Sequence, residues 1–111
     1  MKLLLKNAQI VNVFTDRLET ANVLIDDKKI IGVGGYDDSD ADKVRDLSGK
    51  IICPGFIDGH IHIESTMLTP SELTKVCLLC GTTAIVADPH EIANVCGLSG
   101  IAYMLEASEN L

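Results

Sequence analysis

Hydrophobic residues gather in short runs along the first half of the chain, and polar residues and glycines separate these runs. The runs are rich in branched apolar side chains and cover residues 3–13, 20–27, 29–35 and 49–53. In the second run Ala21, Val23 and Ile25 occupy every other position, so their side chains share one face. Runs of this length between turn signals are typical of β-strands. We therefore predict that residues 1–53 form a small, antiparallel, all-β unit.

Residues 36–46 interrupt this series of strands. They contain five aspartates but only one lysine and one arginine. A run of like charges is usually a solvated surface, although it can also form an acidic binding surface. We interpret the segment as a solvated loop.

The pattern changes after Pro54. Residues 56–64 alternate with period 2, which predicts a strand with two chemically different faces. One face carries isoleucines, and the other carries the titratable residues Asp58, His60, His62 and Glu64.

Helix signals follow this strand. Thr69 is a good N-cap, Pro70 suits the first helical position, Glu72 completes a capping box with Thr69, and Gly81 is a natural stop. The helical spacing predicts a buried face made of Leu73, Val76, Cys77 and Cys80.

A second strand and a second helix complete the chain. Residues 82–87 read as a buried strand that ends at Asp88-Pro89, and residues 90–95 as a helical turn. A second amphipathic helix is predicted from the spacing of its apolar residues, Leu98, Ile101, Ala102 and Leu105. Alternating strands and helices indicate a parallel sheet with right-handed crossovers. Two such units cannot close a (β/α)8 barrel, so we expect residues 54–111 to be the start of one and the chain to be the front of a longer protein.

The composition of the chain argues against two classes of function. A formal net charge of −7 and a pI near 4.7 argue against nucleic-acid binding and against a polybasic membrane contact. No apolar run reaches 18 residues, and the N-terminus has no signal-peptide pattern, so we expect a cytoplasmic protein. The four cysteines are then expected to be reduced thiols.

The two histidines of the 56–64 strand are candidate metal ligands. Residues i and i+2 of a strand share a face, so His60 and His62 can lean onto one ion, and Asp58 can orient one of the imidazoles. The alternative is that both histidines occupy the wet face of a half-exposed strand, and for a bare H-x-H this is the commoner case. A parallel strand, however, is normally buried on both faces, where four polar side chains need a partner. This context favours a metal site.

The sequence also partly matches a different zinc-binding motif. His62-Ile63-Glu64 with Cys77-x-x-Cys80 imitates the H-x-E…P-C-x-x-C signature of zinc nucleobase deaminases. Val76 replaces the proline, only 12 residues separate Glu64 from Cys77, and both cysteines fall on the predicted buried helix face. We therefore reject this motif.

The strings around the histidines resemble a known family. "PGFIDGHIHIE" resembles the first barrel strand of the amidohydrolase superfamily, in which H-x-H supplies two ligands of a mononuclear or binuclear metal centre. The preceding strands, ending in "GKIICPG", resemble part of that superfamily's β-sandwich domain. Within the superfamily, "HIESTMLTPSEL" and "ADPHEIANVCG" resemble the adenine deaminases.

The resemblance implies metal-dependent hydrolytic deamination of adenine to hypoxanthine and ammonia, with adenine and water as the partners. It implies a divalent ion (manganese, iron or zinc), binuclear in the full-length protein, with His60 and His62 as ligands. His90 and Glu91 would face the pocket as catalytic residues, although Glu91 also reads as an ordinary first-turn acid. Asp58 and Glu64 would lie behind the ligands, and 65–68 would form a loop over the pocket. The full-length protein can also be a homo-oligomer.

Two other interpretations stay open at this point. The chain can belong to another amidohydrolase that acts on cyclic amides, such as a dihydroorotase-like enzyme, or to a non-catalytic module with relic histidines. The remaining ligands of the family come from later barrel strands. We therefore expect these 111 residues alone to be inactive on adenine and to bind metal weakly.

Overall fold

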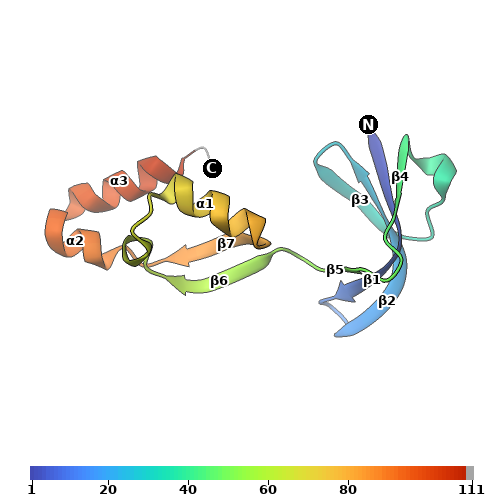
Figure 1. The fold of residues 1–111 in the computed structure, drawn as a ribbon, viewed down its shortest axis with the longest axis horizontal. Coiled ribbons are helices and arrows are strands. Elements are labelled where there is room, and N and C mark those ends of the chain that lie inside the picture. Colours follow the sequence, from blue (N-terminus) through green and yellow to red (C-terminus); the bar gives the residue numbers. More distant parts are fainter. Residues whose placement is uncertain (110–111) are drawn as a thin grey trace. The chain divides into compact units, whose positions relative to one another are not determined.

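The computed structural model describes residues 1–109, which form two units that divide between Pro54 and Gly55. The first unit is a twisted sheet of five strands, shown in blue to green in Figure 1. The strands are β1 (Lys2–Asn12), β2 (Arg17–Asp26), β3 (Lys29–Gly34), β4 (Lys43–Asp46) and β5 (Ile51–Ile52).

Strand β1 is the centre of this sheet. It pairs antiparallel with β2, which pairs antiparallel with β3, as the alternation predicted. On its other side, however, β1 pairs parallel with both β4 and β5, so the prediction of a wholly antiparallel unit is wrong. The buried residues of this unit lie on β1, where Leu4 and Ala8 are fully buried, and on β2, where Val23 and Leu24 are nearly so.

The aspartate-rich segment 36–46 is ordered rather than a simple loop. Asp37 caps a 3-10 turn, Asp38–Asp40, by accepting a hydrogen bond from the backbone N–H of Ser39, and β4 follows it. The Asp42 carboxylate accepts from the backbone N–H of Lys2 at 2.7 Å, which fixes the start of β4 beside β1. The charge pattern did not predict β4, because all four residues of this strand are exposed.

The second unit alternates strands and helices, as predicted. Its elements are β6 (Phe56–Ile61), a 3-10 turn (Glu64–Thr66), α1 (Pro70–Leu79), β7 (Thr82–Ala87), α2 (His90–Cys96) and α3 (Leu98–Ser108). Strands β6 and β7 are parallel, and α1 and α3 lie on one side of them (Figure 1). The two carboxyl ends meet where the backbone N–H of Asp88 donates to the carbonyl of Ile61 at 2.9 Å.

Strand β6 is shorter than its period-2 pattern predicted. It ends at Ile61, and Ile63 already has right-handed helical backbone angles at the entry to the 3-10 turn. The turn places Ile63 in the core with 6% of its surface exposed. His62 and Glu64 therefore leave the strand and lie at its carboxyl end.

The predicted burial of the two strands is wrong for the residues that the structure describes. Phe56, Ile57 and Val86 are each more than half exposed. Helix α1 packs against β7, and these three side chains have little cover among residues 1–109.

Helix α1 begins and ends where the sequence indicated. Thr69 is the N-cap residue, Pro70 is the first helical residue, and Gly81 follows the helix at φ +85°, a conformation that favours glycine. The predicted capping box is wrong, because Thr69 makes no side-chain cap bond and the Glu72 carboxylate instead pairs with Lys75 at 2.6 Å.

The buried faces of the two long helices differ from those predicted. In α1 the side facing β7 carries Leu73 and Cys77, whereas Val76 and Cys80 are exposed. In α3 the buried residue is Gly100, which lies so close to Ile92 of α2 that a Cβ would meet its carbonyl oxygen at 2.9 Å. Ile101 is partly buried, but the other predicted face residues, Leu98, Ala102 and Leu105, are exposed.

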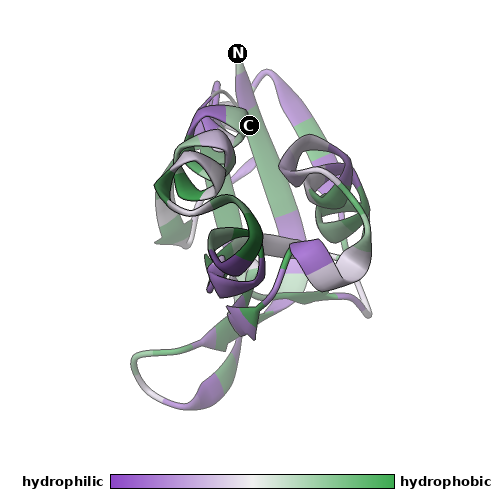
Figure 2. Ribbon diagram, turned by 90° about the vertical axis from the view of Figure 1, so that its left-hand side faces the viewer, coloured by the Kyte–Doolittle hydropathy of each residue, from purple (hydrophilic) through white to green (hydrophobic). Residues whose placement is uncertain are grey.

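The helical ribbons in Figure 2 carry both hydrophobic and hydrophilic residues. No helix among the described residues is long and apolar enough to cross a membrane.

Candidate metal centre

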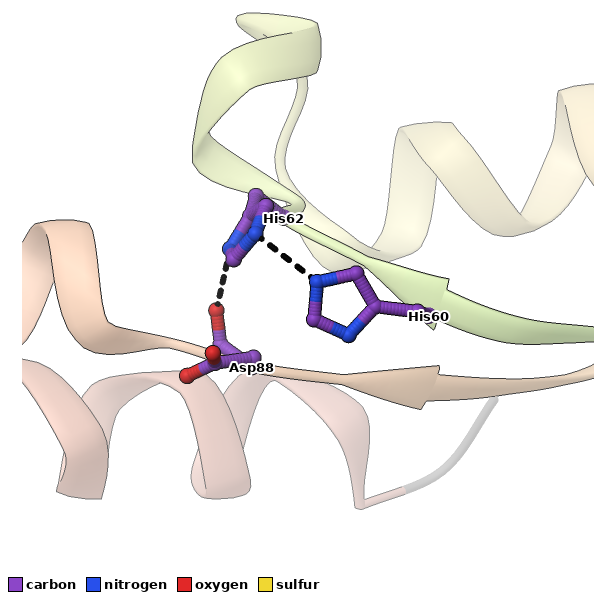
Figure 3. Close-up of side chains that lie close together, drawn as sticks. All are labelled: His60, His62 and Asp88. Atoms are coloured by element: carbon purple, nitrogen blue, oxygen red, sulfur yellow. Dashed lines mark hydrogen bonds between the residues drawn. The ribbon is translucent and has the colours of Figure 1, made fainter.

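His60 and His62 converge at the carboxyl end of β6 (Figure 3). Their Nε2 atoms are 3.1 Å apart, and their rings meet edge to face with centroids 4.7 Å apart. The structure thus brings together the two histidines that the sequence singled out, although His62 lies one residue beyond the strand.

A hydrogen bond fixes the tautomer of His62. Its Nδ1 is 2.9 Å from the backbone carbonyl oxygen of Asp88. Because a carbonyl oxygen can only accept, Nδ1 carries the proton and Nε2 of the neutral ring keeps its lone pair. This is the usual arrangement behind a metal-binding imidazole. His60 then donates its Nε2–H to Nε2 of His62.

The geometry of the pair fits a single ion. Two nitrogens that are each about 2.0–2.1 Å from one ion, at angles of about 95–110°, lie roughly 2.9–3.4 Å apart. The observed 3.1 Å is within this range. Asp88 adds a carboxylate, so that the ligand atoms of His60, His62 and Asp88 all lie within 4.8 Å of one another. Two imidazoles and a carboxylate suit zinc, iron or manganese.

A second set of candidate ligands shares His62. Its members are His62, His90 and Glu91, whose ligand atoms also lie within 4.8 Å of one another. The rings of His62 and His90 meet edge to face with centroids 4.7 Å apart. Since Nδ1 of His62 donates to the Asp88 carbonyl, its Nε2 is the atom left to bind an ion, and the two sets would share that one atom.

Asp88 contributes both its main chain and its side chain to this cluster. Its carboxylate Oδ2 is 3.1 Å from Nδ1 of His90, and this hydrogen bond is the main reason that the pKa of Asp88 lies below its ordinary value. The proximity of His90 and His62 acts in the same direction. Asp88 is therefore ionised at neutral pH, as a metal ligand must be.

Asp88 is the site residue that the sequence pattern did not reveal. The pattern marked it only as the end of the second strand. The signal was available, because the carboxyl ends of adjacent parallel strands meet at one sheet edge and Asp88 directly follows β7 as His62 follows β6.

Asp58 does not hold a histidine ring, contrary to expectation. Its Oδ1 accepts from the backbone N–H of His60 at 3.1 Å. The interaction joins residues i and i+2 and stabilises the local backbone instead. The orienting group is the Asp88 carbonyl, which no sequence pattern marks.

Glu64 and Ser65 connect the 3-10 turn to α2. Oε1 of Glu64 accepts from the backbone N–H of Ile92 at 3.0 Å, and Oγ of Ser65 donates to Oε1 of Glu91 at 2.8 Å. Desolvation alone would raise the pKa of Glu64. Hydrogen bonds from the backbone N–H groups of Glu64 and Ile92, with the nearby His62 and His90, outweigh it and hold that pKa below its ordinary value.

The cysteines take no part in this cluster. Cys77 is partly buried, and Cys53, Cys80 and Cys96 are exposed, all as free thiols. Within residues 1–109 neither set of candidate ligands includes a cysteine.

Comparison with known proteins places this arrangement in a family. The model of the Amidohydrolase family matches residues 51–111, which cover β6, the two histidines and everything after them. This chain belongs to the amidohydrolase family. The match covers both sets of candidate ligands.

Relatives of this amidohydrolase chain share both of its units. It is 51% identical over 109 residues to the adenine deaminase of Kosmotoga olearia, covering 98% of this chain and 18% of that protein. It is 48% identical over 110 residues to the adenine deaminase of Desulfitobacterium hafniense, covering 99% and 19%. The chain thus spans about a fifth of the length of the curated relatives it matches.

Solved structures agree on the fold. D-hydantoinase (dihydropyrimidinase) from Thermus sp. aligns with a TM-score of 0.66 at 24% identity, over 96% of this chain and 24% of that one. A D-aminoacylase, described by its binuclear metal centre, aligns with a TM-score of 0.63 at 27% identity, over 77% and 18%. The fold is therefore that of the amidohydrolases, with strands of a β-sandwich followed by the first two β/α units of a TIM-like barrel.

Proposed function

We propose that this amidohydrolase chain forms one segment of an adenine deaminase, an enzyme that hydrolyses adenine to hypoxanthine and ammonia. The observation that carries the proposal is the identity of 48–51% to curated adenine deaminases, which extends over nearly the whole chain. The likeness to D-hydantoinase is at 24% identity and supports the fold alone, so a cyclic-amide substrate is less well supported.

In this proposal His60 and His62 hold the ion, each through Nε2, and the Asp88 carboxylate is the third donor. A bound divalent ion supplies Lewis-acid activation of the hydrolytic water. The chain's own part is to hold two imidazole nitrogens and one carboxylate close together, and His60 would carry its proton on Nδ1 when its Nε2 is a ligand. The Asp88 carbonyl keeps the proton of His62 on Nδ1, away from the ion.

His90 and Glu91 are the proposed proton-handling residues. They are the first two residues of α2 and lie at the same sheet edge as the ligand pair. The hydrogen bond to Asp88 orients the His90 imidazole, and Ser65 holds the Glu91 carboxylate. Both groups can thus exchange a proton with a substrate bound beside the ion. Manganese, iron or zinc would each satisfy this donor set.

A chimera tests the proposal directly. Residues 1–109 of this chain would replace the matching segment of the Kosmotoga olearia enzyme, to which they are 51% identical. We expect the chimera to convert adenine to hypoxanthine and to leave hydantoin and dihydroorotate unchanged. His60→Ala and His62→Ala should each abolish turnover and lower metal content, whereas Lys75→Ala on the exposed side of α1 should not.

Preference of the chimera for a cyclic amide over adenine would overturn the substrate assignment. Full activity and metal content in the two histidine variants would overturn the metal centre.

A further inference from the structure

Helix α2 accepts part of its N-terminal capping from a distant residue. Its N-cap residue, Pro89, makes no side-chain cap bond, although the first N–H groups of a helix have no partner within the helix. The N–H of Ile92, the third residue of α2, is instead bonded to Glu64 at 3.0 Å. The two residues are 28 positions apart, so this cap comes from another part of the chain.

The turn Glu64–Thr66 and the start of α2 are joined at neighbouring points. Glu64 binds the N–H of Ile92, and Ser65 donates to the carboxylate of Glu91 at 2.8 Å. Just before these contacts, the Asp88 carbonyl holds Nδ1 of His62. The segment that carries His90 is therefore attached on both sides to the segment that carries His62.

The Glu64 carboxylate is suited to this role by its charge and its burial. A negative charge near a helix N-terminus is stabilising, because the free N–H groups there carry partial positive charge. Its Oε2 atom is buried and has no hydrogen-bond partner among the described residues. Besides the bond from its own backbone N–H, the carboxylate thus makes the bond to α2 through Oε1.

We infer that Glu64 is a positioning residue, whose carboxylate caps α2 from the 3-10 turn and so fixes His90 and Glu91 beside the His60–His62 pair. The effect of Glu64 on activity rests on the proposed function. The structural core of the inference, the dependence of the His62–His90 contact on Glu64, is independent of what the site does.

The first test measures that contact in the 111-residue chain. The ring centroids of His62 and His90 are 4.7 Å apart, close enough for a nuclear Overhauser effect between their ring protons. We expect the cross-peak in the wild type and in Glu64→Gln, which keeps an oxygen acceptor for Ile92. We expect Glu64→Ala to lose it and to expose the Ile92 amide to rapid hydrogen exchange. A cross-peak of wild-type strength in Glu64→Ala would overturn the inference, whatever the activity.

Two further variants separate capping from general stability. Glu64→Met keeps most of the side-chain volume but removes the acceptor, so it should behave like Glu64→Ala even if the alanine variant folds poorly. Glu72→Ala, on α1, removes an exposed carboxylate of the same type that pairs only with Lys75. It should leave the cross-peak and the Ile92 amide unchanged. A wild-type cross-peak in Glu64→Met would contradict the inference.

The second test uses the chimera with the Kosmotoga olearia enzyme. Loss of a residue that orients a site typically lowers activity about 10- to 100-fold. We expect Glu64→Ala to lower kcat by this factor with little change in KM, and Glu64→Gln to restore it. Equal damage from Glu64→Gln and Glu64→Ala would assign the effect to charge rather than to the Ile92 bond and would overturn the inference. A chimera with no deaminase activity in any form would count against the proposed function, and the contact between His62 and His90 would then decide the role of Glu64.

Discussion

Replacing His62 by asparagine separates the two bonds that its imidazole is able to make. In the wild type, Nδ1 of His62 is 2.9 Å from the Asp88 carbonyl oxygen. The asparagine amide nitrogen occupies nearly the place of Nδ1, so the variant keeps a donor for this carbonyl. It has no atom at the place of Nε2, which is the candidate ligand. His62→Ala removes both. The pair of variants therefore measures metal binding and local folding apart from each other.

The expected size of each effect follows from its contact. A structural zinc site with four ligands binds with about 10–16 kcal/mol, or about 2.5–4 kcal/mol for each ligand. Mn²⁺ binds imidazole more weakly than Zn²⁺ does, so loss of the Nε2 ligand should weaken Mn²⁺ binding by less than these zinc values imply, about 10- to 100-fold in both variants. Loss of the Nδ1 hydrogen bond should lower the free energy of unfolding by about 0.5–1.5 kcal/mol in His62→Ala only.

The assay titrates the chain with Mn²⁺ and follows the free ion by electron paramagnetic resonance. Manganese suits this purpose because it prefers nitrogen and oxygen ligands to the four thiols of this chain. His60→Ala should match His62→Asn, whereas His90→Ala should bind nearly as the wild type does if the ion lies on His60, His62 and Asp88. Urea unfolding of the same samples gives the stability difference.

Two results would refute the reasoning. Wild-type Mn²⁺ affinity in His62→Asn would show that Nε2 is not a ligand. Equal stability of His62→Asn and His62→Ala would show that the bond to the Asp88 carbonyl, and with it the tautomer assignment, is wrong.

Three further predictions concern other residues. Leu4→Ala should lower the free energy of unfolding by about 2–5 kcal/mol in urea titrations, because this side chain is fully buried in the β1 core; a loss below about 1 kcal/mol would contradict that packing. Asp58→Ala should leave Mn²⁺ affinity within about threefold of the wild type, since Asp58 bonds the backbone of His60 and not its ring, and a tenfold loss would restore it as an orienting group. For Asp88 the folded-state pKa lies below the ordinary value of 3.8, so its ionised form contributes stability above that pH and loses it as pH falls through the folded-state pKa. The stability difference between the wild type and Asp88→Asn should accordingly shrink on acidification below about pH 4, and a difference that grows there would contradict the His90–Asp88 bond.

The order of elements was predictable from the sequence because it depends on local signals. Short apolar runs between turn signals predicted β1 to β3, and Pro70 with Gly81 bounded α1 closely. The change of pattern after Pro54 separated the strands of the first unit from the alternating strands and helices of the second. The parallel pairing of β1 with β4 and β5 was not predictable in this way, because pairing joins distant residues such as Leu3 and Lys43, and β4 has only exposed side chains.

The candidate site was likewise predictable from the sequence only in part. The sequence alone determined that His60 and His62 stand two residues apart on one run, and that His90 and Glu91 follow the next strand. Only the tertiary structure decided which group orients which imidazole, because parallel pairing of β6 and β7 brings the Asp88 carbonyl to Nδ1 of His62.

The role of Glu64 was decided in the same manner. On an ideal strand it would share a face with the histidines. The chain turns after Ile61, however, and the turn carries the Glu64 carboxylate to the N–H of Ile92, 28 residues away. Side-chain spacing along a chain fixes what can share a face, whereas hydrogen bonds between distant segments fix where each proton and each carboxylate is held.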